Sequence, residues 1–168
     1  TNLPLIGVIN FIDLKASSLK EHIIQIERSK TSRTNNFREF LRKMRYEIES
    51  SGKKTIMFTS TEPNQGKTTL LQSLAFSLSL SKKRVLLIDS YISFKTLFED
   101  YTPNEILPKD HILNHLDYFL TMYDYILIEG APLNGFTDAK ELSQFVDGIV
   151  AIFSANAEIK SADKESIK

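Results

Sequence analysis

Residues 54–71 read KTIMFTSTEPNQGKTTLL and contain the strongest local pattern in the chain. A run of β-favouring residues (55–59) is followed by turn-forming residues (60–65), by Gly66-Lys67-Thr68, and then by apolar residues at helical spacing. This order of strand, glycine-lysine-threonine loop and helix is typical of a phosphate-binding loop, the Walker A motif. Backbone N–H groups and the helix dipole at the start of such a helix favour an anion.

Two side chains of this loop have distinct expected roles. Lys67 supplies a full positive charge for the terminal phosphates, and the hydroxyl of Thr68 can bind a phosphate-chelated Mg²⁺. We expect a nucleotide to be bound by the consecutive residues Pro63, Asn64, Gln65, Gly66, Lys67, Thr68 and Thr69. A glycine-lysine-threonine helix start that binds no ligand is the alternative, because short motifs recur by chance.

The motif departs from the full GxxxxGK[ST] pattern at one position. Its first glycine would fall at position 61, where this chain has Thr61. Pro63 and Asn64 still predict a rigid turn followed by a residue that tolerates a positive φ angle.

Composition excludes several classes of protein. The 168 residues are enough for one domain with a sizeable core. The 21 basic residues balance the 21 acidic ones, so no overall field favours nucleic acid as a partner. The absence of cysteine excludes disulfides, thiolate zinc sites and cysteine nucleophiles. No apolar run approaches the roughly 18 residues that a membrane helix needs. Because the chain starts with Thr1 and ends within a helix-like pattern, we expect a fragment of a longer protein.

The chain alternates apolar strands with helices. The predicted strands are 55–59, 84–89, 123–129 and 148–153, and the predicted helices are 37–48, 70–81, 111–122 and 138–145. Continuous apolar strands of this kind predict an α/β, P-loop NTPase-like fold, with a mostly parallel sheet covered by helices on both faces.

We expect a single domain over residues 1–168, in which 37–168 form the core. Residues 1–36 are predicted to form an N-terminal arm and helix. Within them, 3–9 form a short buried strand or an extended arm, 19–26 a helix, and 30–36 a polar loop.

Two predicted strands end in an acidic residue, Asp89 and Glu129. Ligands of parallel sheets bind at the carboxyl ends of the strands, so both acids are expected near the phosphate-binding loop. Mg²⁺ bound to a nucleotide is a natural partner for such buried carboxylates. Ordinary polar strand ends are the alternative.

The helix predicted over 37–48 carries Glu39, Arg42 and Arg45 three residues apart, so their side chains form one row along its surface. Such a row is usually a solvated face with weak ion pairs. The alternative is that it pairs with a neighbouring subunit.

Taken together, these segments resemble the bacterial tyrosine kinases, the cytoplasmic domains of membrane polysaccharide co-polymerases for capsule and exopolysaccharide. The resemblance spans nearly the whole chain. Residues 1–9 (TNLPLIGVI) are similar to the segment that follows the last membrane helix in that family. Residues 39–48 (EFLRKMRYEI) match its E-x-x-R-x-x-R helix, and 123–132 (YDYILIEGAP) resemble its Walker B segment.

The resemblance implies ATP and Mg²⁺ as cofactors. Catalytic roles would fall to Lys67, Asp89 and Glu129, and the metal would lie among Thr68, Asp89 and Glu129. A tyrosine of a neighbouring subunit would attack the γ-phosphate, with Asp89 orienting or deprotonating its hydroxyl.

The resemblance also implies partners and a location. Glu39, Arg42 and Arg45 would form the interface of a ring-shaped homo-oligomer. The other implied partners are a membrane-spanning segment of the same or a partner chain and the polysaccharide export machinery, at the cytoplasmic face of the bacterial inner membrane. No nucleic acid is expected. Assembly and disassembly of rings would control polymer length and export.

Several residues depart from the family pattern. After Asp89, Tyr91 and Ser93 stand where the family has a second acid and an arginine, and the Walker B acid is Glu129 instead of aspartate. The segment between Asp89 and Glu129 is shorter than usual, and no tyrosine-rich tail follows Tyr125. One extra methylene can displace a metal-bound water by about 1 Å, which costs roughly 100-fold in rate. The resemblance with these departures implies kinase activity that is weakened or lost, as in a pseudokinase.

Two other interpretations belong to different classes. The chain could be a non-catalytic oligomerisation or docking module of the same system. It could also be a MinD/ParA-type ATPase, but those proteins have a signature lysine where this chain has Glu62, and this acid argues against them.

Overall fold

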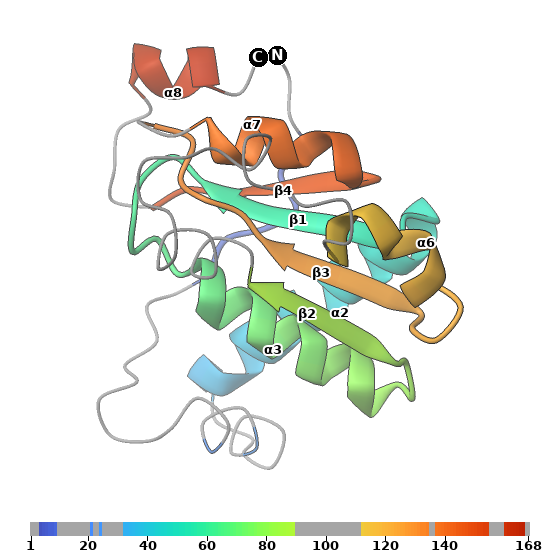
Figure 1. Ribbon diagram of the computed structural model, residues 1–168. Coiled ribbons are helices and arrows are strands. Elements are labelled where there is room, and N and C mark those ends of the chain that lie inside the picture. The colour runs from blue at the N-terminus through green and yellow to red at the C-terminus, as the bar shows by residue number, and fades with distance from the viewer. Residues whose placement is uncertain are drawn as a thin grey trace.

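The computed structural model describes residues 4–9, 21, 24, 32–89, 112–134, 137–154 and 160–166. In this part of the chain, four strands form one parallel sheet in the order β2-β3-β1-β4 (Figure 1). The strands are β1 (Thr55–Ser60), β2 (Val85–Asp89), β3 (Tyr125–Glu129) and β4 (Gly148–Ile152). The predicted α/β class and parallel sheet are confirmed.

The two central strands, β1 and β3, are buried along their whole length. Their side chains alternate between the two faces of the sheet, as the two-residue period of a strand requires. Phe58 contributes to the core on one face and Met57 to the core on the other. The edge strands are more open, and Leu87 of β2 and Ile149 of β4 are exposed.

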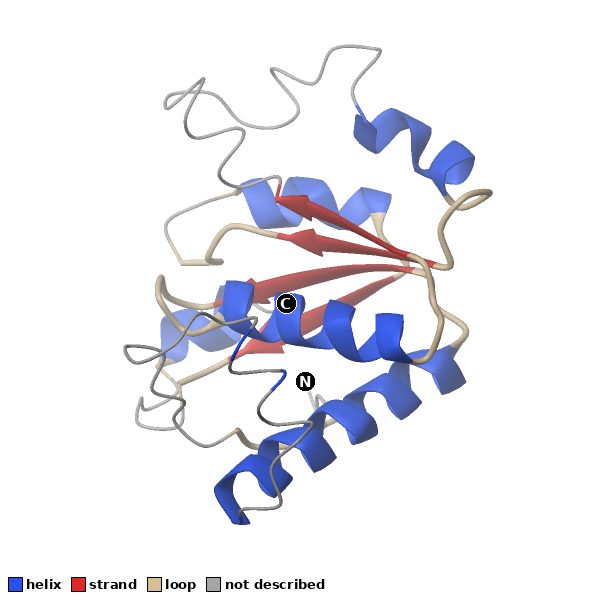
Figure 2. Ribbon diagram, turned by 90° about the horizontal axis from the view of Figure 1, so that it is seen from below, coloured by secondary structure: helices blue, strands red, loops and turns tan. Residues whose placement is uncertain are grey.

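Helices cover both faces, as Figure 2 shows. One face is packed by α2 (Ser32–Ser51) and α3 (Lys67–Leu80), and the apolar stripe of α2 enters the core with Phe37, Leu41, Met44 and Ile48. The other face is packed by η1 (Ile112–His115), α6 (Leu116–Phe119), α7 (Asp138–Leu142) and η2 (Ser143–Phe145). A last helix, α8 (Ser161–Ser166), follows β4. The prediction of helices on both faces is confirmed.

The N-terminal arm is partly as predicted. Residues 4–9 form no strand, and Leu5 and Val8 are exposed, so the buried-strand alternative is wrong. Ile6 and Ile9 pack against the core beneath α2 and α3. The helix predicted over 19–26 lies outside the described residues except for Glu21 and Ile24, which are helical.

Several predicted helix ends were wrong. Most of the loop predicted at 30–36 belongs to α2, which begins at Ser32. A helix is held by backbone hydrogen bonds, so its first turn need not carry the apolar side chains that were used to predict it. Helix α3 begins at Lys67, three residues before the first apolar position. The helix predicted over 111–122 is a 3-10 turn followed by the single turn of α6. Its end is set by the bond from the backbone N–H of Met122 to the carbonyl of Phe119, which turns the chain toward β3. No helix of the described part is long and apolar enough to cross a membrane.

Candidate functional site

The loop between β1 and α3 has the backbone conformation that the sequence predicted. Asn64 has a φ of 60° and Gly66 a φ of 84°, both in the left-handed region. Gly66 directly precedes the first residue of α3, so a side chain there would be strained by the backbone alone. The first turn of α3 contains no acidic residue. Its backbone N–H groups and dipole therefore favour an anion.

Lys67 is buried at the start of α3, with only 7% of its surface exposed. Its Nζ donates a hydrogen bond to the Ser60 hydroxyl at 2.8 Å. Burial lowers the pKa of Lys67 below its ordinary value, and the negative charge of Glu129 partly offsets this effect. A buried ammonium group gains from a nearby anion much more than a solvated one does.

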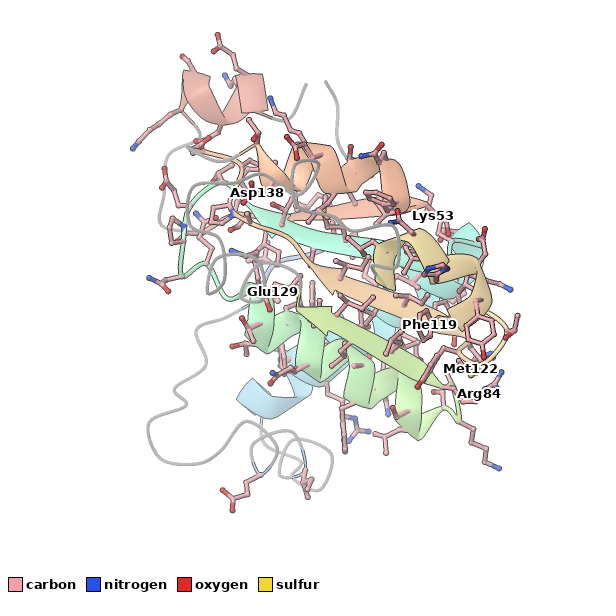
Figure 3. The ribbon with its side chains drawn as sticks, viewed as in Figure 1. Lys53, Arg84, Phe119, Met122, Glu129 and Asp138 are labelled. Carbon is pink, nitrogen blue, oxygen red and sulfur yellow. The ribbon has the colours of Figure 1, made fainter. Side chains whose placement is uncertain are left out.

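Thr68 and Glu129 meet where the loop passes the end of β3. The Thr68 hydroxyl donates a hydrogen bond to Oε1 of Glu129 at 2.7 Å. Glu129 is buried at 6% exposure and lies at the carboxyl end of β3, beside the N-terminal end of α3 (Figure 3). Two residues that the sequence predicted as metal ligands, 61 positions apart, are thus in direct contact.

The third predicted ligand, Asp89, ends the neighbouring strand. Its backbone pairs with that of Glu129 in the β2–β3 register. The two acid-ended strands therefore finish side by side at the edge of the sheet that carries the loop. Tyr91 and Ser93 lie outside the described residues.

The hydroxyl oxygen of Thr68 and the carboxylate oxygens of Glu129 are ligands of the kind that Mg²⁺ prefers. In the described part of the chain, no group of three His, Cys, Asp or Glu side chains could hold a metal ion. Mg²⁺ usually takes one or two protein ligands and completes its coordination with water and phosphate oxygens. The site thus fits a metal that arrives together with a phosphate.

Thr61, which replaces the first glycine of the motif, is built into the loop by hydrogen bonds. It is buried, and its carbonyl accepts from the backbone N–H of Asn134 at 3.1 Å. Its hydroxyl donates to Oε1 of Gln65 at 3.4 Å, and the same oxygen accepts from the backbone N–H of Glu62 at 3.3 Å. The side chains of Thr61 and Gln65 therefore stabilise the turn at the position where the usual motif has a glycine.

Sequence reasoning missed three residues around the loop: Ser60, Asn134 and Asp163. Ser60 is the partner of Lys67, and its hydroxyl donates to the carbonyl of Glu62 at 2.6 Å. Asn134 donates from Nδ2 to Glu62 at 3.1 Å and to Asp163 at 2.8 Å. Its position, five residues after a strand-ending acid at the carboxyl edge of the sheet, was a usable signal.

The row of charged side chains on α2, formed by Glu39, Arg42 and Arg45, is only partly exposed for contact with a neighbouring subunit. Arg42 forms an ion pair with Glu39 at 2.9 Å, and both side chains are exposed. Arg45 is half-buried and donates to the carbonyl of Ser77 on α3 at 3.3 Å. Glu39 and Arg42 are thus the exposed members of the row, whereas Arg45 contributes to the packing of α2 on α3.

These features define an α/β domain with a strand–loop–helix of the phosphate-binding type, whose loop touches an acid at the end of a neighbouring strand. Compared by sequence, the chain matches no protein-family model and no curated protein.

Compared by structure, the chain is similar to bacterial tyrosine kinase domains. The tyrosine kinase domain BceF matches with a TM-score of 0.71 and 22% identity, over 98% of this chain and 86% of that one. The chimerical protein CapA2B2 matches with a TM-score of 0.70 and 19% identity, over 98% and 87%. The kinase domain of the Escherichia coli tyrosine kinase Etk matches with a TM-score of 0.69 and 16% identity, over 98% and 82%. The chain therefore has the fold of these kinase domains, and the resemblance seen in the sequence is confirmed at the level of the fold.

Proposed function

We propose that this chain is an ATP-binding, tyrosine-kinase-like domain of a bacterial polysaccharide export system. The observation that carries the proposal is the contact between Thr68 and Glu129 at 2.7 Å, next to the buried ammonium group of Lys67. A hydroxyl, a carboxylate and a lysine gathered at a helix start have the chemistry needed to hold a metal-chelated triphosphate. The shared fold with tyrosine kinase domains supports the same interpretation.

Each residue would have a separate task at the bound nucleotide. Backbone N–H groups of residues 64–69 would surround the phosphates, and Lys67 would neutralise the terminal ones. Thr68 and Glu129, with Asp89 at the next strand end, would hold Mg²⁺, which neutralises phosphate charge when bound.

Transfer to a tyrosine would depend mainly on Asp89. In this proposal Asp89 orients or deprotonates the hydroxyl of a tyrosine from a neighbouring subunit. Tyr91 and Ser93 replace the second acid and the arginine of the kinases, and Glu129 is one methylene longer than aspartate. We therefore expect nucleotide binding to persist while transfer is weak or lost, because the loop and Lys67 supply most of the affinity.

The proposed setting is the cytoplasmic face of the bacterial inner membrane, where subunits would form rings that control polymer length and export. A non-catalytic docking module is the second candidate, and the exposed Glu39–Arg42 pair favours it. An ATPase of the MinD/ParA type is less compatible. Glu62, which stands at the position of their signature lysine, accepts a hydrogen bond from Asn134 within the same subunit.

The proposed nucleotide site is tested by titrating a fluorescent ATP analogue in the presence of Mg²⁺. Wild type should bind saturably, and Lys67→Met should lose roughly 30-fold or more in affinity, because it removes the buried charge but keeps the aliphatic stem. The matched control is Lys140→Met, which removes an exposed lysine of α7 and should bind like wild type. No saturable binding by wild type would leave only the docking module.

Kinase chemistry is tested separately by phosphotyrosine blotting after incubation with Mg²⁺ and ATP. A phosphotyrosine signal that Asp89→Ala abolishes would identify an active kinase. A binding-competent wild type without any signal would identify a pseudokinase.

A further inference from the structure

Asn134 connects three separate segments around the phosphate-binding loop. Its backbone N–H donates to the carbonyl of Thr61 at 3.1 Å, and its side-chain amide donates to Glu62 at 3.1 Å. The same amide donates to Oδ1 of Asp163 on α8 at 2.8 Å. One asparagine thus joins the segment after β3, the first half of the loop and the C-terminal helix.

Asp163 completes this connection from the side of α8. It is buried at 5% exposure although it lies on a short, mostly exposed helix. Its second oxygen, Oδ2, accepts from the backbone N–H of Lys160 at 2.7 Å, which closes the first turn of α8. The hydrogen bonds from Asn134 and Lys160 lower the pKa of Asp163 below its ordinary value, with a further contribution from Thr61. Both carboxylate oxygens are therefore used, one within α8 and one toward the loop.

The loop has a particular need for such support. Its first glycine is replaced by buried Thr61, and Asn64, which has a Cβ, keeps a φ of 60°. Strained loop conformations persist only where the surroundings hold them. The contacts of Thr61 and Glu62 with Asn134 supply part of that support from outside the loop.

We propose that Asn134 is a positioning residue for the phosphate-binding loop, and that through Asp163 it couples the docking of α8 to phosphate binding. The inference rests on the proposed nucleotide-binding function. Because coupling between two sites is reciprocal, a phosphate bound in the loop stabilises docked α8, and docked α8 increases the affinity of the loop.

The test combines affinity with hydrogen exchange, using a non-hydrolysable ATP analogue with Mg²⁺. In wild type the analogue should slow amide exchange over residues 160–166, which are not part of the loop. In Asn134→Ala the affinity should fall roughly 5- to 50-fold, and the slowing of exchange in α8 should disappear. Asn36→Ala, an exposed asparagine on α2, is the matched control and should behave like wild type.

A second variant keeps Asn134 and tests the coupling from the side of α8. Asp163→Asn keeps one oxygen that can accept from Asn134, but its N–H₂ group then faces the backbone N–H of Lys160. The slowing of exchange in α8 should therefore weaken, while the loss of affinity should be smaller than in Asn134→Ala. Equal affinity and equal slowing of exchange in wild type and Asn134→Ala would overturn the inference. A wild type that binds no nucleotide at all would instead overturn the proposed function, so the two failures are distinguishable.

Discussion

At the scale of single residues, the candidate site depends on buried charges with short-range partners. Lys67 and Glu129 are both less than a tenth exposed, and Thr68, the second residue of α3, donates its hydroxyl hydrogen to Glu129. A buried charge without a partner would be costly, so these residues constrain one another. Changing the charge of one of them while keeping its shape should therefore separate their roles.

Glu129→Gln is the most informative change of this kind. The amide can still accept the hydrogen bond from Thr68, but it no longer offers a negative charge to Mg²⁺. We expect the enhancement of nucleotide binding by Mg²⁺ to fall roughly 10- to 100-fold. Binding without Mg²⁺ should stay equal or improve, because one negative charge near the phosphates is gone. Nucleotide titrations in the presence of Mg²⁺ and in the presence of EDTA measure the two affinities. An unchanged enhancement of binding by Mg²⁺ would contradict the role of Glu129 as a metal ligand.

The residues that the sequence could reveal are those of the local motif. Gly66, Lys67 and Thr68 are adjacent in the chain, and Glu129 ends an apolar strand, so spacing and strand polarity are enough to predict their neighbourhood. Asn134 and Asp163 lie 72 and about 100 positions from the loop residues that they support. Partners at such separations are brought together by the tertiary fold. The position of Asn134 after a strand-ending acid hints at a place near the loop, but no local pattern marks Asp163.

At the scale of secondary structure, the type of element was easier to predict than its ends. The strands were recognisable as short continuous apolar runs, such as 85–88 and 125–128. The run 125–128 is buried on both faces, whereas 85–88 lies at the edge of the sheet, where Leu87 is exposed. Helix ends depend on individual hydrogen bonds, such as those that close the chain after α6. Apolar periodicity carries no information about them, which explains why the helix predicted over 111–122 was too long.

The starts of β2 and β3 are joined by a contact that gives a pH-dependent prediction. Oδ2 of Asp124 accepts from the backbone N–H of Arg84 at 2.8 Å, and Oδ1 accepts from its guanidinium at 3.2 Å. Arg84 lies at the end of the sheet opposite to Glu129 (Figure 3). The hydrogen bonds from Arg84 lower the pKa of Asp124 below its ordinary value of 3.8.

A carboxylate whose pKa is lower in the folded chain than in the unfolded chain stabilises the fold at pH values above its ordinary pKa. This contribution is lost as the pH falls through the pKa of the folded state. Asp124→Asn should therefore lower the Tm at about pH 7, and its difference from wild type should shrink as the pH falls below 3.8 and through the lower pKa of the folded state. Thermal unfolding followed by circular dichroism measures both, with Glu47→Gln, an exposed acid of α2, as control. A difference that stays constant with pH would show that the charge of Asp124 contributes nothing.

At the scale of the whole molecule, the sheet order explains why the candidate site forms where it does. Strand β1 lies between β3 and β4, so the loop that follows β1 emerges between the ends of two neighbouring strands. Ligand sites of parallel sheets lie at such points. The sequence predicted parallel strands but not their order. The apolar runs of the four strands are similar in composition, so they are compatible with several strand orders.

Assembly gives a further prediction at this scale. If α2 forms a subunit interface, opposite charges at Glu39 and Arg42 would pair across it as they now pair within one subunit. Arg42→Glu should then shift sedimentation toward the monomer, because it places two like charges at the interface. Lys43→Glu alters an exposed neighbour by the same charge and should change the profile less. An unchanged profile for Arg42→Glu would indicate a solvated row with no role in assembly.

The internal bonds of Lys67 and Thr68 have a consequence for selectivity. Lys67 donates one of the three N–H groups of its ammonium to Ser60, so it can bind an arriving anion as well. Thr68 donates its only hydroxyl proton to Glu129, so a hydrogen bond from Thr68 to an anion would replace an existing one. Such a replacement is nearly neutral in free energy, since the net worth of one hydrogen bond is only about 1 kcal/mol. Ligands should then differ in affinity mainly by the number of negative charges that they carry, and an uncharged analogue of the same shape should bind the loop weakly.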